Sequence, residues 1–196
     1  MGLEDLAAFR AVHSSTVLYP SDANQAVRLV ELMADQDRIA YLRTHRGAMP
    51  VIYAADESFE VGGSRVVRDG DDVTLVGAGV TLHEALAAAE RLAGDGVRAR
   101  VIDLYSIKPV DVDTIAQAAA ETGAIVTVED HWPEGGLGDA VLSGLAESGE
   151  TCRVRKLAVG AMPGSGSPEE LIHEAGIDAD AIATAARELV GARATA

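Results

Sequence analysis

The sequence has little sulfur and few basic groups, and each shortage excludes a class of protein. A single cysteine, Cys152, allows no disulfide within the chain and no cysteine-based metal site, which favours a reducing compartment. Lys and Arg total 16 against 31 Asp and Glu, and the formal charge of −15 argues against nucleic acid and anionic membranes as partners. No apolar run reaches spanning length, and Met1–Leu6 does not resemble a signal peptide. We therefore expect a cytoplasmic protein.

Aromatic residues are also scarce, while small aliphatic residues are abundant. The apolar fraction is 48%, yet there are only two Phe, four Tyr and one Trp, so a core must be built from Ala, Val, Leu and Ile. Beyond residue 71, short β-branched runs alternate with helical stretches. This alternation predicts right-handed crossovers and an open, mostly parallel sheet in a three-layer α/β domain spanning residues 71–196. The expected strands are 73–76, 99–104, 124–128 and 153–159.

Local signals place several of the helix ends in this region. Thr81 with Glu84 and Ser167 with Glu170 both have the spacing of a capping box, in which each side chain accepts a backbone N–H of the other residue. Gly123 follows a helical stretch and predicts a left-handed stop.

The first part of the chain is organised differently. Residues 1–53 offer a helix near residues 3–10, strands at 16–19 and 38–43, and a run at 51–53 that extends or pairs near them. A helix over 23–34 has Val27, Val30 and Leu32–Met33 as its apolar stripe. These elements are too few to close a sheet, so we expect 1–53 to be part of a larger domain. Residues 54–70 are acidic and glycine-rich and are interpreted as a linker, with a short strand at 64–68.

Glu129, Asp130, His131 and Trp132 form the densest polar cluster of the sequence, directly after an expected strand and before three glycines. Ligands of open α/β sheets bind at such strand ends. Two interpretations are open: a catalytic acid and imidazole, or a set of hydrogen-bonding groups at an interface.

A second cluster, Arg43-Thr-His-Arg46, follows the expected strand at 38–43. Two guanidinium groups at a strand end are suited to a phosphate or a carboxylate. Charge balance against the acidic surface explains them equally well.

Three glycine motifs do not support ligand sites. Gly77-Ala-Gly79 lacks the third glycine of a dinucleotide fingerprint, so a tight turn that packs a helix on the sheet is the better interpretation. Gly94-Asp95-Gly96 copies the start of the thiamine-diphosphate metal motif, but the Asn required downstream is absent. Gly164–Ser167 precedes a helix whose first turn is already acidic, which favours capping over anion binding.

The sequence as a whole resembles transketolase. The segments that resemble its C-terminal domain are Asp72–Leu86, Arg100–Asp111 and Val126–Ala140, the last including Glu129-Asp-His-Trp-Pro-Glu-Gly-Gly136. The segments that resemble the end of its pyrimidine-binding domain are Leu3–Leu6, Ser15–Asp22 and Tyr41–Thr44.

This resemblance implies the C-terminal section of an enzyme of the pentose phosphate pathway that moves a two-carbon ketol unit between sugar phosphates. The resemblance also implies that thiamine diphosphate and Mg²⁺ are held by an N-terminal section that this sequence lacks. It assigns substrate phosphate binding to Arg46, with Arg43 as the fallback, and interface hydrogen bonding to Glu129, Asp130 and His131. An N-terminal transketolase chain is then the expected partner, in a dimer or another homo- or hetero-oligomer.

Two other functions fit the same residues. One is a non-catalytic interaction or regulatory module. The other is the C-terminal part of a related thiamine-dependent enzyme, either a ketoacid dehydrogenase or deoxyxylulose-phosphate synthase. The motif Glu129–Gly136 is more similar to transketolase than to either of these enzymes.

Overall fold

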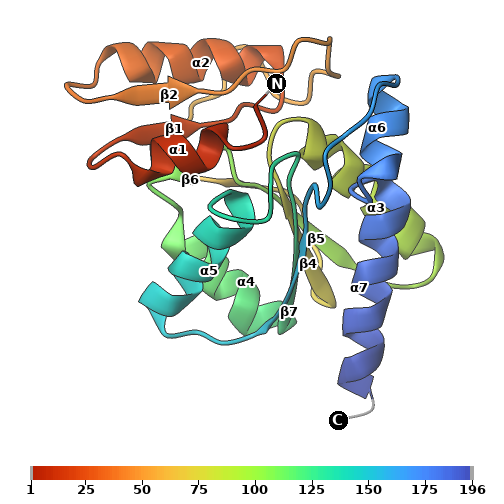
Figure 1. Ribbon diagram of the computed structural model, residues 1–196. Helices are drawn as coiled ribbons and strands as arrows, with labels where there is room; N and C mark the ends of the chain where they lie inside the picture. Colours follow the sequence, from red (N-terminus) through yellow and green to blue (C-terminus); the bar gives the residue numbers. More distant parts are fainter. Residues whose placement is uncertain (1, 195–196) are drawn as a thin grey trace.

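Two sheets of mainly parallel strands meet end to end in the computed structural model, which describes residues 2–194, with side chains to residue 191 (Figure 1). The larger sheet has the strand order β3-β5-β4-β7-β8. Its strands are β3 (Arg65–Arg68), β4 (Val73–Gly77), β5 (Ala99–Asp103), β7 (Ala124–Val128) and β8 (Arg153–Leu157). Only β3 is antiparallel to its neighbour, so the prediction of a mostly parallel sheet is confirmed.

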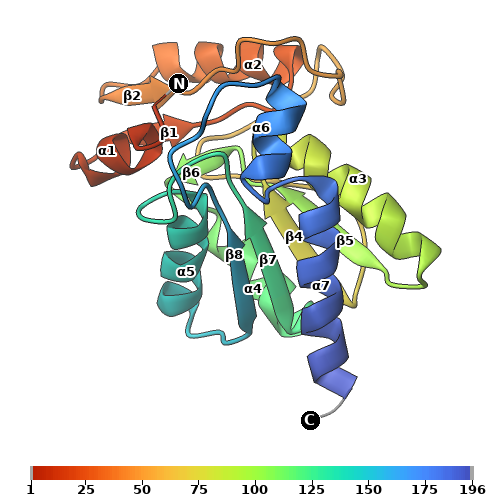
Figure 2. The same ribbon diagram turned by 45° about the vertical axis from the view of Figure 1, so that its right-hand side comes forward.

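Helices cover both faces of the larger sheet and complete the expected three layers (Figures 1 and 2). One face carries α3 (Val80–Gly94) and α7 (Ala179–Ala194), and the other carries α4 (Val112–Thr122) and α5 (Leu137–Ser148). The short helix α6 (Pro168–Glu174) precedes α7. Within residues 2–194 no helix is long and apolar enough to cross a membrane.

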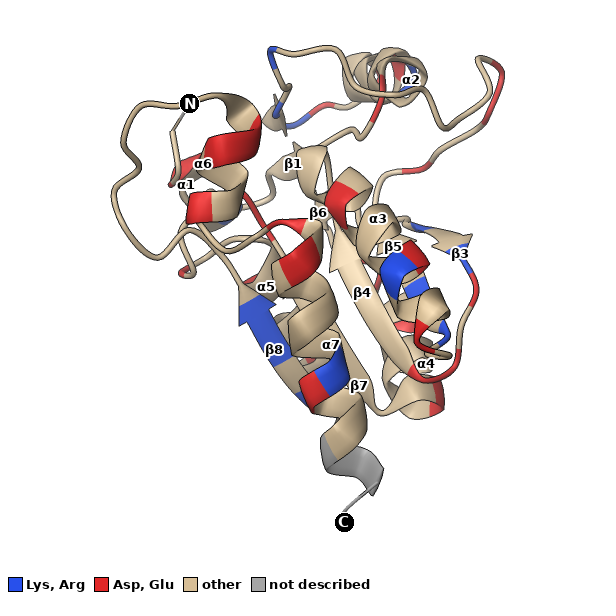
Figure 3. Cartoon of the chain, turned by 90° about the vertical axis from the view of Figure 1, so that its right-hand side faces the viewer, with Lys and Arg blue, Asp and Glu red and all other residues tan. Residues whose placement is uncertain are grey.

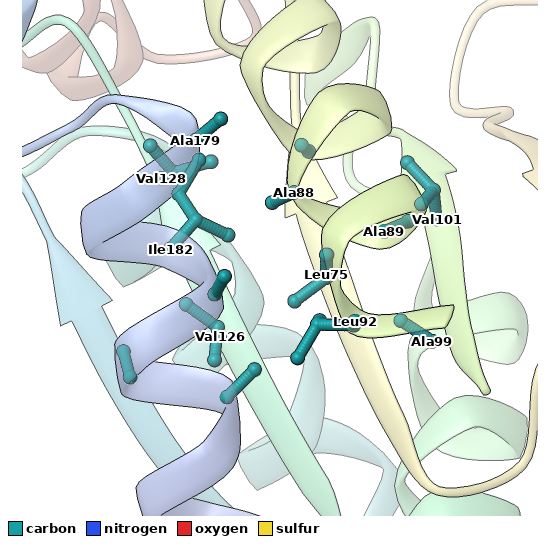
Figure 4. Close-up of a cluster of buried hydrophobic side chains, with 14 of the residues drawn as sticks. Leu75, Ala88, Ala89, Leu92, Ala99, Val101, Val126, Val128, Ala179 and Ile182 are labelled. Carbon is teal, nitrogen blue, oxygen red and sulfur yellow. The ribbon is translucent and has the colours of Figure 1, made fainter. Parts of the chain in front are cut away.

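The core under α3 and α7 is built from small aliphatic side chains, as the composition predicts. Ala88 of α3 packs above Leu75 of β4, Ala89 lies beside Val101 of β5, and Ile182 of α7 lies beside Val128 of β7 (Figure 4). Because alanine side chains are short, α3 can lie close to both the sheet and α7, which keeps the packing dense without aromatic rings.

The smaller sheet contains a strand that the sequence did not reveal. Its order is β2-β1-β6, and β1 and β2 are parallel, while β6 is antiparallel to β1. The elements are α1 (Asp5–Ala11), β1 (Thr16–Leu18), α2 (Ala23–Ala34), β2 (Ala40–Leu42) and β6 (Ser106–Lys108). The third strand of the smaller sheet therefore comes from the segment that follows β5 and not from the first 53 residues.

Residues 51–53, expected to extend or pair as a strand, do not form one. The backbone N–H groups of Ile52 and Tyr53 donate to Asp22 Oδ2 at 2.7 and 2.8 Å, so this run is held at the N-terminus of α2 instead of in a sheet. In the segment interpreted as a linker, the short strand expected at 64–68 is present as β3, and it is an edge strand of the larger sheet.

One of the two predicted capping boxes is wrong and the other is confirmed. Helix α3 begins at Val80 behind Gly79, and the Thr81 hydroxyl instead lies 2.9 Å from the carbonyl oxygens of Ala78 and Val128. Glu84 accepts the N–H of Ala179, so it ties α3 to α7. At α6, by contrast, Ser167 and Glu170 form both bonds of the box.

The turn at Gly77-Ala-Gly79 is a close-packing device, as expected. Gly79 has φ +56°, and a Cβ built there would lie 2.0 Å from the ring carbon Cζ of Tyr19. Tyr19 follows β1, so this glycine lets an aromatic ring from the smaller sheet lie directly on the loop that ends β4.

We predict that Gly79→Ala lowers the free energy of unfolding by at least about 3 kcal/mol, because it adds a steric clash to an unfavourable φ. Gly96→Ala is the matched control: Gly96 also has positive φ, +78°, but nothing lies within 4 Å of its Cβ position. The control should cost only about 1 kcal/mol. Urea unfolding of both variants measures the difference, and equal losses would contradict the role given to Tyr19.

Candidate functional site at the facing strand ends

The carboxyl ends of the parallel strands in the two sheets face each other. Tyr19 and Arg43, which follow β1 and β2, contact Asp130, which follows β7. Ser21 contacts Asp103 at the end of β5, and its hydroxyl accepts the N–H of Gly79 at 2.9 Å. The polar residues singled out at strand ends are thus brought together by the meeting of the two sheets.

Arg43 is the centre of the first polar cluster and is only 3% exposed. Its guanidinium donates to Asp130 Oδ1 at 3.1 Å and to the Asp130 carbonyl at 2.9 Å, lies 3.2 Å from Asp5 Oδ2, and sits over the Tyr19 ring. Burial alone would lower the pKa of Arg43, but Asp130, Tyr19 and Asp5 raise it above its ordinary value. Arg43 is therefore a buried, paired cation with no exposed surface for a sugar phosphate.

Asp103 forms the second polar cluster and is fully buried. Its carboxylate accepts hydrogen bonds from Ser21, Gln25 and Tyr53 at 2.8, 2.8 and 2.7 Å. Burial raises the pKa of Asp103 to about 6, although these three donors oppose the shift. All three donors belong to residues 1–53, so Asp103 anchors the first part of the chain to the larger sheet.

Glu129 faces the N-terminus of α5. Its two carboxylate oxygens accept the N–H groups of Leu137 at 2.6 Å and Gly138 at 3.1 Å. Burial raises the pKa of Glu129 to about 7 against the effect of these bonds. A Cβ at Gly136 would lie 1.8 Å from Glu129 Oε2, which explains one glycine of the run that follows the cluster.

His131 and Trp132 bind the segment around α1. His131 Nε2 accepts the N–H of Ala7 at 3.3 Å, so the ring proton is on Nδ1, which donates to the Trp132 carbonyl at 2.7 Å. The Trp132 N–H donates to Leu3 O at 2.8 Å. His131 Nδ1 and Glu129 Oε2 are 4.0 Å apart, too far for a hydrogen bond. This geometry favours interface hydrogen bonding within the chain over a catalytic acid and imidazole.

Arg46 is placed quite differently from Arg43. It lies exposed in the loop after β2 and makes no hydrogen bond or ion pair with residues 2–194. The adjacent His45 is half-buried, and its Nδ1 accepts the Gly47 N–H at 3.1 Å. Of the two candidate arginines, only Arg46 presents a free guanidinium.

A cavity of about 430 Å³ lies beside this loop and was not foreseen. His45, Val80 and Asp130 line one side, and apolar residues before and within α6 line the other. β5 and β7 flank β4 on opposite sides, so the cavity lies where the strand order reverses, the usual ligand position in such sheets. A single sequence does not give strand order, which is why this site was missed.

No group of three or more His, Cys, Asp or Glu in the described part of the chain could hold a metal ion. Asp95, of the motif that resembles the thiamine metal site, caps α3 and binds Arg187 at 2.6 and 2.8 Å. Asn24 donates to the Tyr53 carbonyl. These residues do not fit a site for thiamine diphosphate and magnesium.

Comparisons with known proteins show that the chain is similar to members of one family. Residues 62–182 match the family described as "Transketolase, C-terminal domain". The chain is 50% identical to transketolase of Homo sapiens over 194 residues, and 48% identical to transketolase-like protein 2 of Mus musculus over 193. Each match covers 97% of this chain and 31% of the relative. The chain therefore spans about a third of the length of these curated relatives.

A solved structure has the same fold over nearly the whole chain. It is described as "Split gene transketolase, inactive beta4 tetramer" and has a TM-score of 0.93 at 34% identity. The match covers 97% of this chain and 63% of that chain.

We predict that Asp130→Ala lowers the free energy of unfolding by about 3 kcal/mol or more, because it leaves Arg43 buried without its main partner. The control is Glu188→Ala, which removes an exposed ion pair to Arg155 and should cost less than about 1 kcal/mol. Urea unfolding compares the two. Equal stability of Asp130→Ala and the control would contradict the role of Asp130 as the main partner of the buried Arg43.

A pH prediction follows from Asp103. Its folded pKa, about 6, lies above its ordinary 3.8, so the native state binds the proton more tightly than the unfolded state does. The resulting stabilisation is fully present below pH 4 and is lost as the pH rises through 6. From pH 5 to pH 8 the free energy of unfolding of the wild type should fall by about 1–1.5 kcal/mol more than that of Asp103→Asn does. Unfolding curves at both pH values test this, and parallel pH profiles would exclude it.

Proposed function

The chain belongs to the transketolase C-terminal domain family, and from this premise we propose that it is the carboxyl-terminal part of a transketolase. In the complete assembly, two-carbon ketol units are transferred between sugar phosphates with thiamine diphosphate and Mg²⁺ as cofactors. This chain supplies assembly surface and a phosphate-binding arginine. An N-terminal transketolase chain holds the cofactor, and without it the chain is inactive.

One observation carries the proposal: similarity to transketolases extends over 97% of the chain, well ahead of the family match that begins at residue 62, and the aligned part is 31% of the human relative. A module selected only for a regulatory surface would not need to preserve both sheets and the loop after β2. A carboxyl-terminal subunit or fragment of a transketolase accounts both for the extent of the similarity and for the share of the relative that is covered.

Arg46 is the residue we assign to the substrate phosphate. Its guanidinium is exposed and unpaired in a protein of formal charge −15, so it is available to an incoming anion. A guanidinium binds phosphate through two parallel charge-assisted hydrogen bonds. Arg43 is assigned a structural role because its guanidinium is occupied by Asp130 and Asp5.

Complementation tests the proposal. The probe is human transketolase from which the 31% matched by this chain has been removed, because the two proteins are 50% identical over the matched part. We expect neither polypeptide alone to transfer ketol units, and the mixture with thiamine diphosphate and Mg²⁺ to convert xylulose 5-phosphate and ribose 5-phosphate. Turnover by the isolated chain, or by neither the parts nor the mixture, would contradict the proposal.

In the active mixture, Arg46→Ala should raise the KM for sugar phosphates at least tenfold, because it removes a charge-assisted contact of about 1.5–3 kcal/mol. The thiamine diphosphate concentration giving half activity should not change. Arg38→Ala is the control, since Arg38 is also exposed and precedes the same strand at its other end. The assignment fails if both variants have the same KM.

A further inference from the structure

We propose that the cavity between the loop after β2 and the segment leading into α6 binds a small organic amine, with an apolar body and an oxygen atom close to the nitrogen. The ammonium group binds Asp130, the oxygen accepts a hydrogen bond from His45, and the apolar body packs on the wall formed around α6. This site is separate from the phosphate contact assigned to Arg46, and it does not depend on ketol transfer.

The cavity has the size and lining of a small-molecule site. Its volume is about 430 Å³, and ligand sites in proteins have volumes of roughly 300–1,000 Å³. Most of the lining is apolar and includes Val159, Leu171 and Ile177, whereas Asp130 and His45 contribute the only polar side chains of the lining. A mainly apolar wall with a few polar groups that fix orientation is the usual composition of such sites.

Asp130 offers the cavity a carboxylate with unused acceptor positions. The residue lines the cavity, and its side chain is 12% exposed. Oδ1 accepts one bond from Arg43 and Oδ2 accepts one from the Tyr19 hydroxyl, both at 3.1 Å. Because each carboxylate oxygen has two acceptor positions, both oxygens can receive a further donor.

The charge at this end of the cavity favours a cation. Arg43 lies within ion-pair distance of both Asp130 and Asp5, so one positive charge faces two carboxylates. Burial raises the pKa of Asp130, and the charge of Arg43 opposes this shift. An ammonium group in the cavity would act in the same direction as Arg43 and favour the ionised carboxylate.

The rest of the surroundings adds negative charge and no Lys or Arg. A hollow of about 190 Å³ adjoins the cavity, shares Val159, Met162 and Ala175 with its lining, and adds Glu174. Helix α6, on the opposite wall, carries three Glu and neither Lys nor Arg (Figure 3). These charges attract a cation and repel a phosphate, so sugar phosphates are not the ligands expected here.

His45 supplies the second polar contact. Its Nδ1 accepts the Gly47 N–H at 3.1 Å, so the proton of the neutral ring is on Nε2. Within residues 2–194, Nε2 has no hydrogen-bond partner. The cavity therefore combines one N–H donor with one carboxylate, and an amino alcohol or an amino ketone is the complement of this pair.

Three probes with a common phenyl–CH(OH)– core test the proposal: 2-amino-1-phenylethanol, 1-phenyl-1,2-ethanediol and mandelate. They end in an ammonium, a hydroxyl and a carboxylate group, respectively. We expect the amine to bind with a Kd of roughly 1–10 mM, which is the range for a ligand of this size. The diol should bind at least about tenfold more weakly, because it lacks the charge-assisted bond. Mandelate should show no binding.

Methyl NMR of the chain locates the binding. The Met162, Leu171 and Ile172 methyl signals should shift on titration with the amine, because these residues line the cavity. The signals of Leu142, which is 41% exposed on α5, serve as the reference and should not move.

Substitutions in the cavity separate this site from non-specific binding. Ala175→Phe should abolish the shifts, because Ala175 lines the cavity and the added ring fills it. Ala146→Phe is the matched control, since Ala146 is exposed on α5, and it should bind the amine like the wild type. His45→Ala should weaken binding of the amine about threefold through the loss of one neutral hydrogen bond.

Asp130→Asn should remove the preference for the amine over the diol. If this variant does not fold, the three probes on the wild type and the Ala175→Phe comparison still decide. Equal binding of the amine and the diol would overturn the inference, as would binding of mandelate or shifts that persist in Ala175→Phe. Shifts of the same methyl signals with protein concentration alone would assign the cavity to a second copy of this chain and also overturn it.

Discussion

Two buried carboxylates hold this structure together. Asp103 ends β5 and Asp130 follows β7, and each accepts its side-chain hydrogen bonds or ion pairs from residues 1–53. A buried carboxylate is costly unless its oxygens are satisfied, so the larger sheet is stable in this form only when the first part of the chain is docked on it. The same bonds fix the direction of docking, because hydroxyl, amide and guanidinium donors must reach particular oxygens. Ion pairs and hydrogen bonds therefore determine how the smaller sheet is oriented on the larger one, and apolar packing adds to the stability of this arrangement.

The position of these bonds explains why much of the strand-end region is not a conventional ligand site. Open α/β sheets bind ligands at the carboxyl ends of their strands. Here Tyr19 and Arg43 occupy much of that region, and Gly79 allows the Tyr19 ring to rest on the turn after β4. What stays accessible is the cavity that His45 helps to line, and the next residue in the chain, Arg46, is exposed. The architecture thus uses most of these strand ends for contacts between the two sheets.

Much of the larger sheet could be predicted because its signals are local. Alternation of β-branched runs with alanine-rich helices indicates parallel crossovers, and Ser167 and Gly123 mark helix ends through bonds to nearby backbone. The errors have a different cause. Thr81 and residues 51–53 have patterns typical of a cap and a strand, but hydrogen bonds to distant residues decide their placement. Val27 belongs to the expected apolar stripe of α2, yet it is 57% exposed because Gln25 and Leu29 take the buried face. β6 is only three residues long and has no periodicity to detect.

The candidate site was only partly readable from the sequence for the same reason. Residue types at strand ends predicted two polar clusters as candidate sites, and their functional roles stay predictions. Burial distinguishes Arg43 from Arg46, and that burial follows from the meeting of the two sheets. Glu129, Asp130 and His131 are bonded to α5, Arg43 and Ala7 within the chain, and their assignment to an interface between domains or subunits stays a prediction.

The position of β6 has a consequence for how a protein of this kind can be divided. Ser106–Lys108 lies in sequence between β5 and α4 of the larger sheet, yet it pairs with β1 of the smaller one. A cut anywhere in residues 54–70 would therefore separate β1 and β2 from a strand of their own sheet and leave that strand on the other product. An unbroken chain through residues 54–70 therefore keeps all three strands of the smaller sheet in one polypeptide.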